Sequence, residues 1–121
     1  NLLVTDVPRA VRFVTEVLGA TSFYDDEDFA ALRWNGQDFM FHADHAYRDN
    51  ALSGIVAGLE ARGAGVELRL YGCDPDVAEA KARELGFTVL AGSIDKPHGL
   101  RECVILDDDG YAWVPAVAIA R

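Results

Sequence analysis

One order of sequence features occurs twice in this chain, and it limits the fold more than any other property. In the first half, an apolar segment leads through Asp6 into a helical pattern that ends at Gly19. In the second half, another apolar segment leads through Asp74 into a helical pattern that ends at Gly86. Asp is a preferred N-cap, and Gly commonly follows the last turn of a helix. Strand-like segments follow each helix, so a repeat of roughly 65 residues indicates a duplicated βαβββ module rather than a solenoid.

Turn residues divide both halves into short elements. The expected helices are 7–18, 52–62 and 75–85, and the expected strands are 1–5, 21–24, 29–34, 38–42, 66–71, 87–90, 100–106 and 111–119. Asn35-Gly36 and Asp109-Gly110 predict hairpin turns, because Gly accepts the positive φ that short hairpins need. The expected organisation is a single domain over 1–121, with module one at 1–45, a linker at 46–64 and module two at 65–121.

Both ends of the chain resemble a known superfamily. Gly-Leu-Arg-Glu at 99–102, an apolar strand and Asp-Asp-Asp-Gly at 107–110 resemble the last hairpin of the glyoxalase, bleomycin-resistance and extradiol-dioxygenase proteins. That superfamily usually has Asp-Pro-Asp-Gly, and here Asp108 replaces the proline. The segment 4–19 resembles the opening strand and helix of the superfamily, except that Val14 stands where a tyrosine is usual.

This resemblance implies the vicinal oxygen chelate fold, which is an α+β fold. In it, two βαβββ modules form a curved mixed-sheet cleft that binds a metal ion or a ligand. Residues that face such a cleft alternate along each strand with residues that face away from it. The fold hosts lyases, isomerases, dioxygenases and binding proteins, so the fold alone does not determine an activity.

Charge and composition exclude two classes of partner. The 121 residues carry a formal net charge of −9, and an acidic surface repels phosphate backbones, so no nucleic acid partner is expected. No apolar run approaches the roughly 20 residues that span a bilayer, so no membrane partner is expected. Cys73 and Cys103 have no metal-type spacing, and no signal peptide is visible. These features predict a reduced, cytoplasmic protein.

The resemblance also implies four positions at which metal-dependent members carry His or Glu. The first lies about one residue before Asn1, the second among 39–41, the third near Glu67 and the fourth at Val114. Phenylalanine and valine cannot coordinate a metal, and methionine does not suit a hard divalent ion. We therefore predict that the protein uses no metal ion and no other cofactor.

Polar and aromatic side chains on the expected strands are the candidates for ligand binding. Glu67, Arg69 and Tyr71 share one face of their strand, which is either the cleft side or a solvated surface. The aromatic residues either form the core or stack on a flat ligand. The predicted ligand-binding residues are Trp34, Phe39, Phe41, Glu67, Arg69, Tyr71, His98, Arg101 and Trp113.

The leading prediction is a small-molecule binding protein that resembles the bleomycin-resistance type. Such a protein is a homodimer that confers antibiotic resistance by sequestering a cationic or planar ligand without metal. The acidity of the chain either serves solubility or attracts that cation. The alternative is a metal-dependent glyoxalase-like or dioxygenase-like lyase or oxidoreductase that uses Glu67 and a histidine before Asn1. A protein-interaction module is a third class, and no residue supports it.

Overall fold

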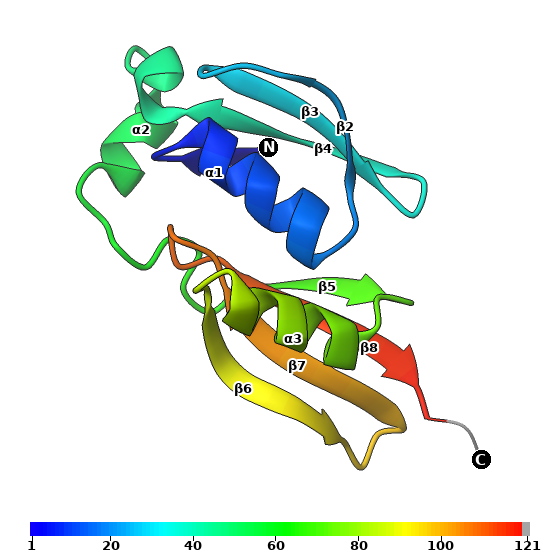
Figure 1. The fold of residues 1–121 in the computed structure, drawn as a ribbon. Coiled ribbons are helices and arrows are strands. Elements are labelled where there is room, and N and C mark those ends of the chain that lie inside the picture. The colour runs from blue at the N-terminus through cyan, green and yellow to red at the C-terminus, as the bar shows by residue number, and fades with distance from the viewer. Residues whose placement is uncertain (120–121) are drawn as a thin grey trace. The chain divides into compact units, whose positions relative to one another are not determined.

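The chain forms two compact units, which divide between Arg62 and Gly63 in a computed structural model that describes residues 1–119 (Figure 1). Each unit contains one four-stranded mixed sheet. The strand orders are β1-β4-β3-β2 and β5-β8-β7-β6, so the two sheets have the same connectivity. In both, the first strand is parallel to the last, and the other pairs are antiparallel. The predicted α+β fold with a duplicated βαβββ module is confirmed.

The first unit begins with a strand and a capped helix. Its elements are β1 (Leu2–Val4), α1 (Val7–Arg12), the π-helical turn η1 (Phe13–Val17), β2 (Thr21–Asp25), β3 (Phe29–Trp34), β4 (Gln37–Ala43), the 3-10 helix η2 (Asp44–Tyr47) and α2 (Ala51–Val56). Asp6 caps α1 by accepting a hydrogen bond from the backbone N–H of Arg9 at 3.1 Å. The helix expected over 7–18 is α-helical only to Arg12, in front of a stretch whose β-branched residues lower helix propensity.

The helix α1 packs on one face of the first sheet, where the core of the unit lies. Fully or almost fully buried side chains on this side include Val7 and Val11 of α1, Ala30 and Leu32 of β3, and Phe41 of β4. Side chains alternate along a strand, so the neighbours of these core residues project from the opposite face. We call that opposite face the distal face of the first sheet; it carries Phe29 and Ala31 of β3, paired with His42 and Met40 of β4.

The second unit repeats this arrangement. Its elements are β5 (Glu67–Tyr71), α3 (Pro75–Glu84), β6 (Thr88–Asp95), β7 (Leu100–Leu106) and β8 (Ala112–Ala118). Asp74 caps α3 by accepting from the backbone N–H groups of Asp76 at 2.9 Å and Val77 at 3.3 Å. The helix α3 packs against β6, β7 and β8. The distal face of the second sheet, which is the face turned away from α3, carries Glu67, Arg69 and Tyr71 of β5.

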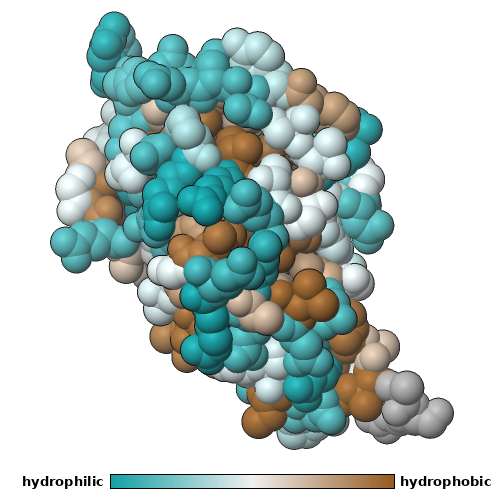
Figure 2. Space-filling model, viewed as in Figure 1, coloured by the Kyte–Doolittle hydropathy of each residue, from teal (hydrophilic) through white to brown (hydrophobic). Residues whose placement is uncertain are grey.

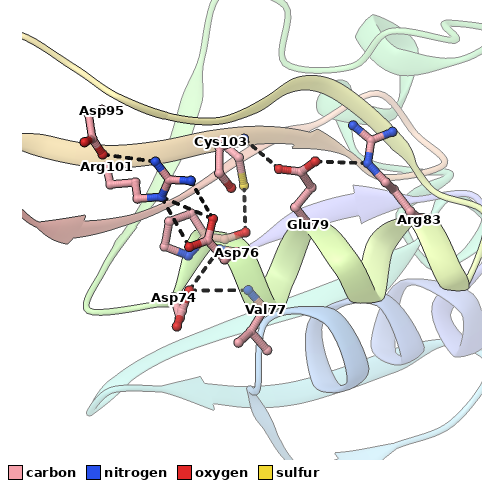
Figure 3. A network of polar contacts seen from close by, with 10 residues as sticks. Asp74, Asp76, Val77, Glu79, Arg83, Asp95, Arg101 and Cys103 are labelled. Atoms are coloured by element: carbon pink, nitrogen blue, oxygen red, sulfur yellow. Dashed lines mark hydrogen bonds and ion pairs between the residues drawn. The ribbon is translucent and has the colours of Figure 1, made fainter.

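A polar network fastens α3 to its sheet (Figure 3). Arg101 of β7 donates to Asp76 of α3 at 2.9 Å and to Asp95 of β6 at 3.1 Å. On the next turn of the helix, Glu79 accepts from the backbone N–H of Ser93 at 2.6 Å. Arg101 therefore turns toward α3 and serves to hold the helix, on the face opposite to Glu67 and Arg69.

The two expected hairpins differ in their construction. At Asn35 and Gly36 the φ angles are 47° and 77°, so both residues adopt the left-handed conformation of a two-residue turn, as predicted. The second connection is a longer loop, in which Asp107 N–H donates to the carbonyl of Tyr111 at 3.1 Å. The buried Asp107 carboxylate organises this loop by accepting from the backbone N–H groups of Asp109 and Tyr111, each at 3.0 Å.

The segment that connects the two units ends inside the first of them. Arg62 is only 2% exposed and donates to the backbone carbonyl of Leu3 at 3.1 Å. It also forms a bidentate ion pair with Asp44, in which both N–O distances are 2.7 Å. The helix expected over 52–62 is shorter, at Ala51–Val56, and Gly58, shortly after its end, has a positive φ of 77° that is incompatible with a continuing α-helix.

Hydrophobic side chains at the surface lie in separate patches among hydrophilic ones on the face drawn in Figure 2. Exposed apolar residues include Phe23 and Tyr24 on the edge strand β2, and Leu90 and Ile94 on the edge strand β6. Within residues 1–119 there is no helix of sufficient length and hydrophobicity to cross a membrane.

Candidate ligand-binding surfaces

A polar cluster occupies the distal face of the second sheet. Arg69 donates to the hydroxyl of Tyr71 at 3.0 Å and to the carboxylate of Glu67 at 3.3 Å. The same guanidinium donates a short hydrogen bond to Glu102 of β7, and the His98 Nε2 atom lies 3.5 Å from that carboxylate. We call these five side chains the polar cluster.

The polar cluster extends across the strand that lies between its two carboxylates. Strand β8 lies between β5 and β7, and Ala116 pairs with both Tyr71 and Glu102. Arg69 lies opposite Val114 of β8 and extends diagonally over that strand to the carboxylate of Glu102 beyond it.

Glu102 is the buried member of the cluster, at 7% exposed. Burial acts to raise the pKa of Glu102, but the hydrogen bond and charge of Arg69, assisted by His98, outweigh burial and lower the pKa. The same contact raises the pKa of Arg69. Two carboxylates thus surround one guanidinium, so with His98 neutral the cluster has a net negative charge. Arg69 is already paired and is a poor anchor for an anion.

A hollow of about 250 Å³ lies on the first sheet. Its lining is mainly apolar and aromatic, and consists of Phe23, Phe29, Ala31, Leu32, Asp38, Phe39 and Met40. Arg33 borders it, with its guanidinium 4.6 Å from the centre of the Phe23 ring and its Nε 2.5 Å from Asp38. This part of the molecule therefore already combines an aromatic face, a cation and a carboxylate.

Aromatic rings continue from the hollow across the same sheet. The ring centres of Tyr24 and Phe29 are 6.1 Å apart, those of Phe29 and His42 are 4.9 Å apart, and those of His42 and Tyr47 are 4.9 Å apart. We call these four rings the aromatic row. It runs from β2 over β3 and β4 to the 3-10 helix η2.

Acidic residues surround the start of this row. Asp25 ends β2, and the turn that leads to β3 consists of Asp26, Glu27 and Asp28. Asp26 accepts a hydrogen bond from the Tyr24 hydroxyl at 2.6 Å, and that bond lowers the pKa of Asp26. This succession of acidic residues places a concentrated negative formal charge at the start of the row.

The structure brings together only some of the predicted binding residues. Glu67, Arg69, Tyr71 and His98 meet in the polar cluster, and Phe39 borders the hollow on the other sheet.

The remaining predicted residues have structural roles. Phe41 is completely buried in the core, and Trp113 is 4% exposed with its indole N–H donating to Asp107 at 2.9 Å. Trp34 donates to the carbonyl of Leu18 at 3.1 Å, and Arg101 holds α3. We therefore leave these four residues out of the candidate surfaces.

Sequence reasoning missed several members of both surfaces. Glu102 follows Arg101, and the two side chains project from opposite faces of β7. Only the pairing of β7 with β8 shows that Glu102, and not Arg101, lies on the same side of the sheet as Arg69. Met40 lies between the two predicted phenylalanines, and alternation counted from the Asn35-Gly36 turn would have placed it with His42. No local signal marked Phe23 of β2.

The donor groups do not fit the superfamily's metal site. Met40 and Val114 hold the distal-face positions on β4 and β8, and neither is a ligand for a hard divalent ion. Among the described residues, no three His, Cys, Asp or Glu side chains are grouped so that they could hold a metal ion.

Solved structures give the fold a precedent. A glyoxalase/bleomycin resistance protein/dioxygenase from Nocardioides is 22% identical, with a TM-score of 0.70 over 98% of this chain and 80% of that one. A glyoxalase-related enzyme from Fulvimarina pelagi is 17% identical, with a TM-score of 0.75 over 97% and 84%. The chain has the vicinal oxygen chelate fold. The fosfomycin resistance protein FosX from Mesorhizobium loti shares it, at 14% identity and a TM-score of 0.68 over 98% and 87%.

No family model and no curated protein matches the sequence of the chain. The vicinal oxygen chelate fold is thus established by the structure, and a shared fold does not by itself determine an activity.

Proposed function

We propose that this vicinal oxygen chelate protein binds a planar, cationic small molecule without a metal ion. The observation that supports the proposal is the apolar hollow on the first sheet, which has Asp38 in its lining and the aromatic row with its acidic turn beside it. A flat aromatic ligand gains from offset stacking on Phe29 and from contact with Met40. Its positive charge gains from the ring faces and from the nearby carboxylates.

The protein's own Arg33 supports the choice of a cation. Its guanidinium lies over the ring of Phe23 and beside the carboxylate of Asp38. Because Arg33 already occupies these two partners, a ligand cation would use the other rings that line the hollow, Phe29 and Phe39, and the carboxylates of the acidic turn. An anionic ligand would instead meet the acidic turn that begins at Asp25, and its binding would be disfavoured.

The polar cluster of the second sheet is a separate candidate for ligand contact. Its net negative charge also favours a cation, and the exposed carboxylate of Glu67 is its most accessible acceptor. A substitution Glu67→Gln tests this surface alone. Weaker binding of a cation by that variant would include the polar cluster in the proposed function.

Calorimetric titration with two matched probes tests the proposal. Aminoacridine is a planar cation at neutral pH, and anthracene sulfonate has a similar ring system with a negative charge. We expect micromolar binding of the cation, weakened by high salt but not abolished, because stacking persists when charges are screened. Binding of the sulfonate with equal or higher affinity would contradict the proposal.

Two variants locate the binding. Phe23 is 58% exposed and borders the hollow, whereas Leu90 is 64% exposed on the second sheet. Phe23→Ala should weaken aminoacridine binding about threefold to tenfold, which corresponds to loss of one aromatic contact. Leu90→Ala should leave it unchanged. Both variants should keep their stability within about 0.5 kcal/mol, as surface substitutions usually do.

Metal analysis separates this proposal from the alternative of a metal-dependent lyase or oxidoreductase. The purified protein should bind aminoacridine equally well before and after treatment with a chelator. One tightly held ion per chain, with binding or stability lost in chelator, would favour the enzyme.

A further inference from the structure

His42 lies in the middle of the aromatic row, with its ring between those of Phe29 and Tyr47. Its Nδ1 atom lies 2.7 Å from the amide oxygen of Asn1. The amide nitrogen of Asn1 donates in turn to the hydroxyl of Tyr47 at 2.9 Å. Two rings and one amide therefore fix both the position and the rotation of the imidazole.

This arrangement selects one tautomer of His42. An amide oxygen only accepts hydrogen bonds, so the Nδ1 atom that contacts Asn1 carries the proton. In a neutral imidazole, the other nitrogen is then an acceptor. Within residues 1–119, no protein donor occupies Nε2 of this half-buried ring.

We infer that Nε2 of His42 accepts a hydrogen bond from an N–H group of the bound ligand, and so selects planar cations that carry such a donor. The inference rests on the proposed function and makes it more specific. A planar cation that stacks along the row places its edge near His42. There, an N–H group finds an acceptor, whereas an N-methyl group at the same place leaves the acceptor unpaired and adds bulk.

The inference predicts a difference between two ligands of equal charge and shape. The probe is dimethylaminoacridine, whose only N–H is at its protonated ring nitrogen, and the control is its ring-nitrogen-methylated analogue, which has no N–H. A hydrogen bond to a positively charged donor corresponds to roughly a tenfold difference in affinity. We expect the wild-type protein to bind dimethylaminoacridine about tenfold more tightly than its ring-nitrogen-methylated analogue.

The substitution His42→Phe retains a ring in the row and removes the acceptor. The variant should bind the two ligands equally, at about the affinity of wild type for the methylated one. His42→Gln, which keeps a side-chain acceptor without the ring, should retain part of the preference. Thermal unfolding of both variants checks that the unit remains folded.

A second measurement reports on the tautomer directly. Nitrogen-15 NMR of the ring at mildly alkaline pH should show a protonated Nδ1 and an unprotonated Nε2, and Asn1→Ala should reduce this preference. A neutral ring with its proton on Nε2 would overturn the inference. Equal binding of both ligands by the wild type would overturn it as well and would leave the proposed function intact. Failure of the protein to bind either ligand would remove both.

Discussion

Arg69 of β5 pairs with Glu102 of β7, although strand β8 lies between them. The guanidinium reaches the carboxylate across β8, where Val114 lies opposite Arg69 and Ala116, with its short side chain, lies opposite Glu102. Glu102 is only 7% exposed, and Arg69 is the main partner of its carboxylate, assisted by His98. The polar cluster therefore depends on a long-range contact that no local part of the sequence contains.

Replacement of Glu102 by Gln should destabilise the protein. The substitution removes a charged hydrogen-bond partner of Arg69, at a cost of about 1.5 kcal/mol, the lower end for charged pairs because Arg69 is partly solvated. The folded state lowers the pKa of Glu102, so its contribution is present above the unfolded pKa of roughly 4.3 and is lost as the pH falls below it.

Urea unfolding of wild type and variant between neutral and acidic pH checks this prediction. The difference in unfolding free energy should shrink as the pH falls. Glu84→Gln, at an exposed position near the end of α3, is the matched control and should change little. An equal loss of stability in the two variants would show that the Arg69–Glu102 pair is not important.

Asp107 should show the opposite pH dependence. Burial raises its pKa, although it accepts bonds from Trp113 and two backbone N–H groups. A raised pKa means that the folded state binds the proton more tightly, so this stabilisation is present at low pH and is lost as the pH rises through that pKa.

The variant Asp107→Asn isolates this effect. It cannot ionise, and its amide nitrogen would oppose the indole N–H of Trp113, so we expect a loss of about 1–3 kcal/mol at neutral pH. We define the advantage of wild type as its free energy of unfolding minus that of the variant, measured by urea unfolding followed by tryptophan fluorescence. This advantage should decrease from acidic to neutral pH. An advantage that grows with pH would reverse the sign we assign.

The two cysteines should be unreactive in the folded protein. Burial raises the pKa of both Cys73 and Cys103 to about 11, so thiolate is scarce at neutral pH, and both side chains are shielded. Iodoacetamide should therefore label neither residue in native buffer over a time in which it labels both in urea. Rapid native labelling, measured by mass spectrometry, would contradict their placement in the core.

Association of two chains is a further prediction. Apolar side chains such as Phe23 on β2 and Ile94 on β6 are exposed on edge strands, where unpaired backbone groups favour pairing with another chain. Sedimentation equilibrium at micromolar concentration should give about twice the chain mass of 13.2 kDa. A mass of one chain under these conditions would contradict the prediction.

Much of the fold follows from local sequence signals. Asp6 and Asp74 cap helices, and the Asn35-Gly36 turn fixes the β3–β4 register, because each acts on its own neighbours. The loop at Asp107 was not predictable in its length, since its form depends on one buried carboxylate that binds three donors.

The candidate surfaces were predictable only where alternation along one strand was sufficient. Glu67 and Arg69 share a face by their spacing alone, and the structure places them together. Either Met40 or Phe41 could lie on the distal face of β4. The sequence does not show which one does, because β4 has apolar residues on both faces. Trp113 is bound by Asp107 in the core, a contact that the type of residue cannot show.

The most direct test of the central claim is to locate a planar cation on the protein. In a nitrogen-15 NMR titration with aminoacridine, saturable shifts should concentrate at backbone amides of the first sheet, near Phe23, Phe29 and Met40. Residues of α3 should be unaffected. Saturable shifts confined to the second unit, or no saturable shift at ligand concentrations in the micromolar range, would contradict the account.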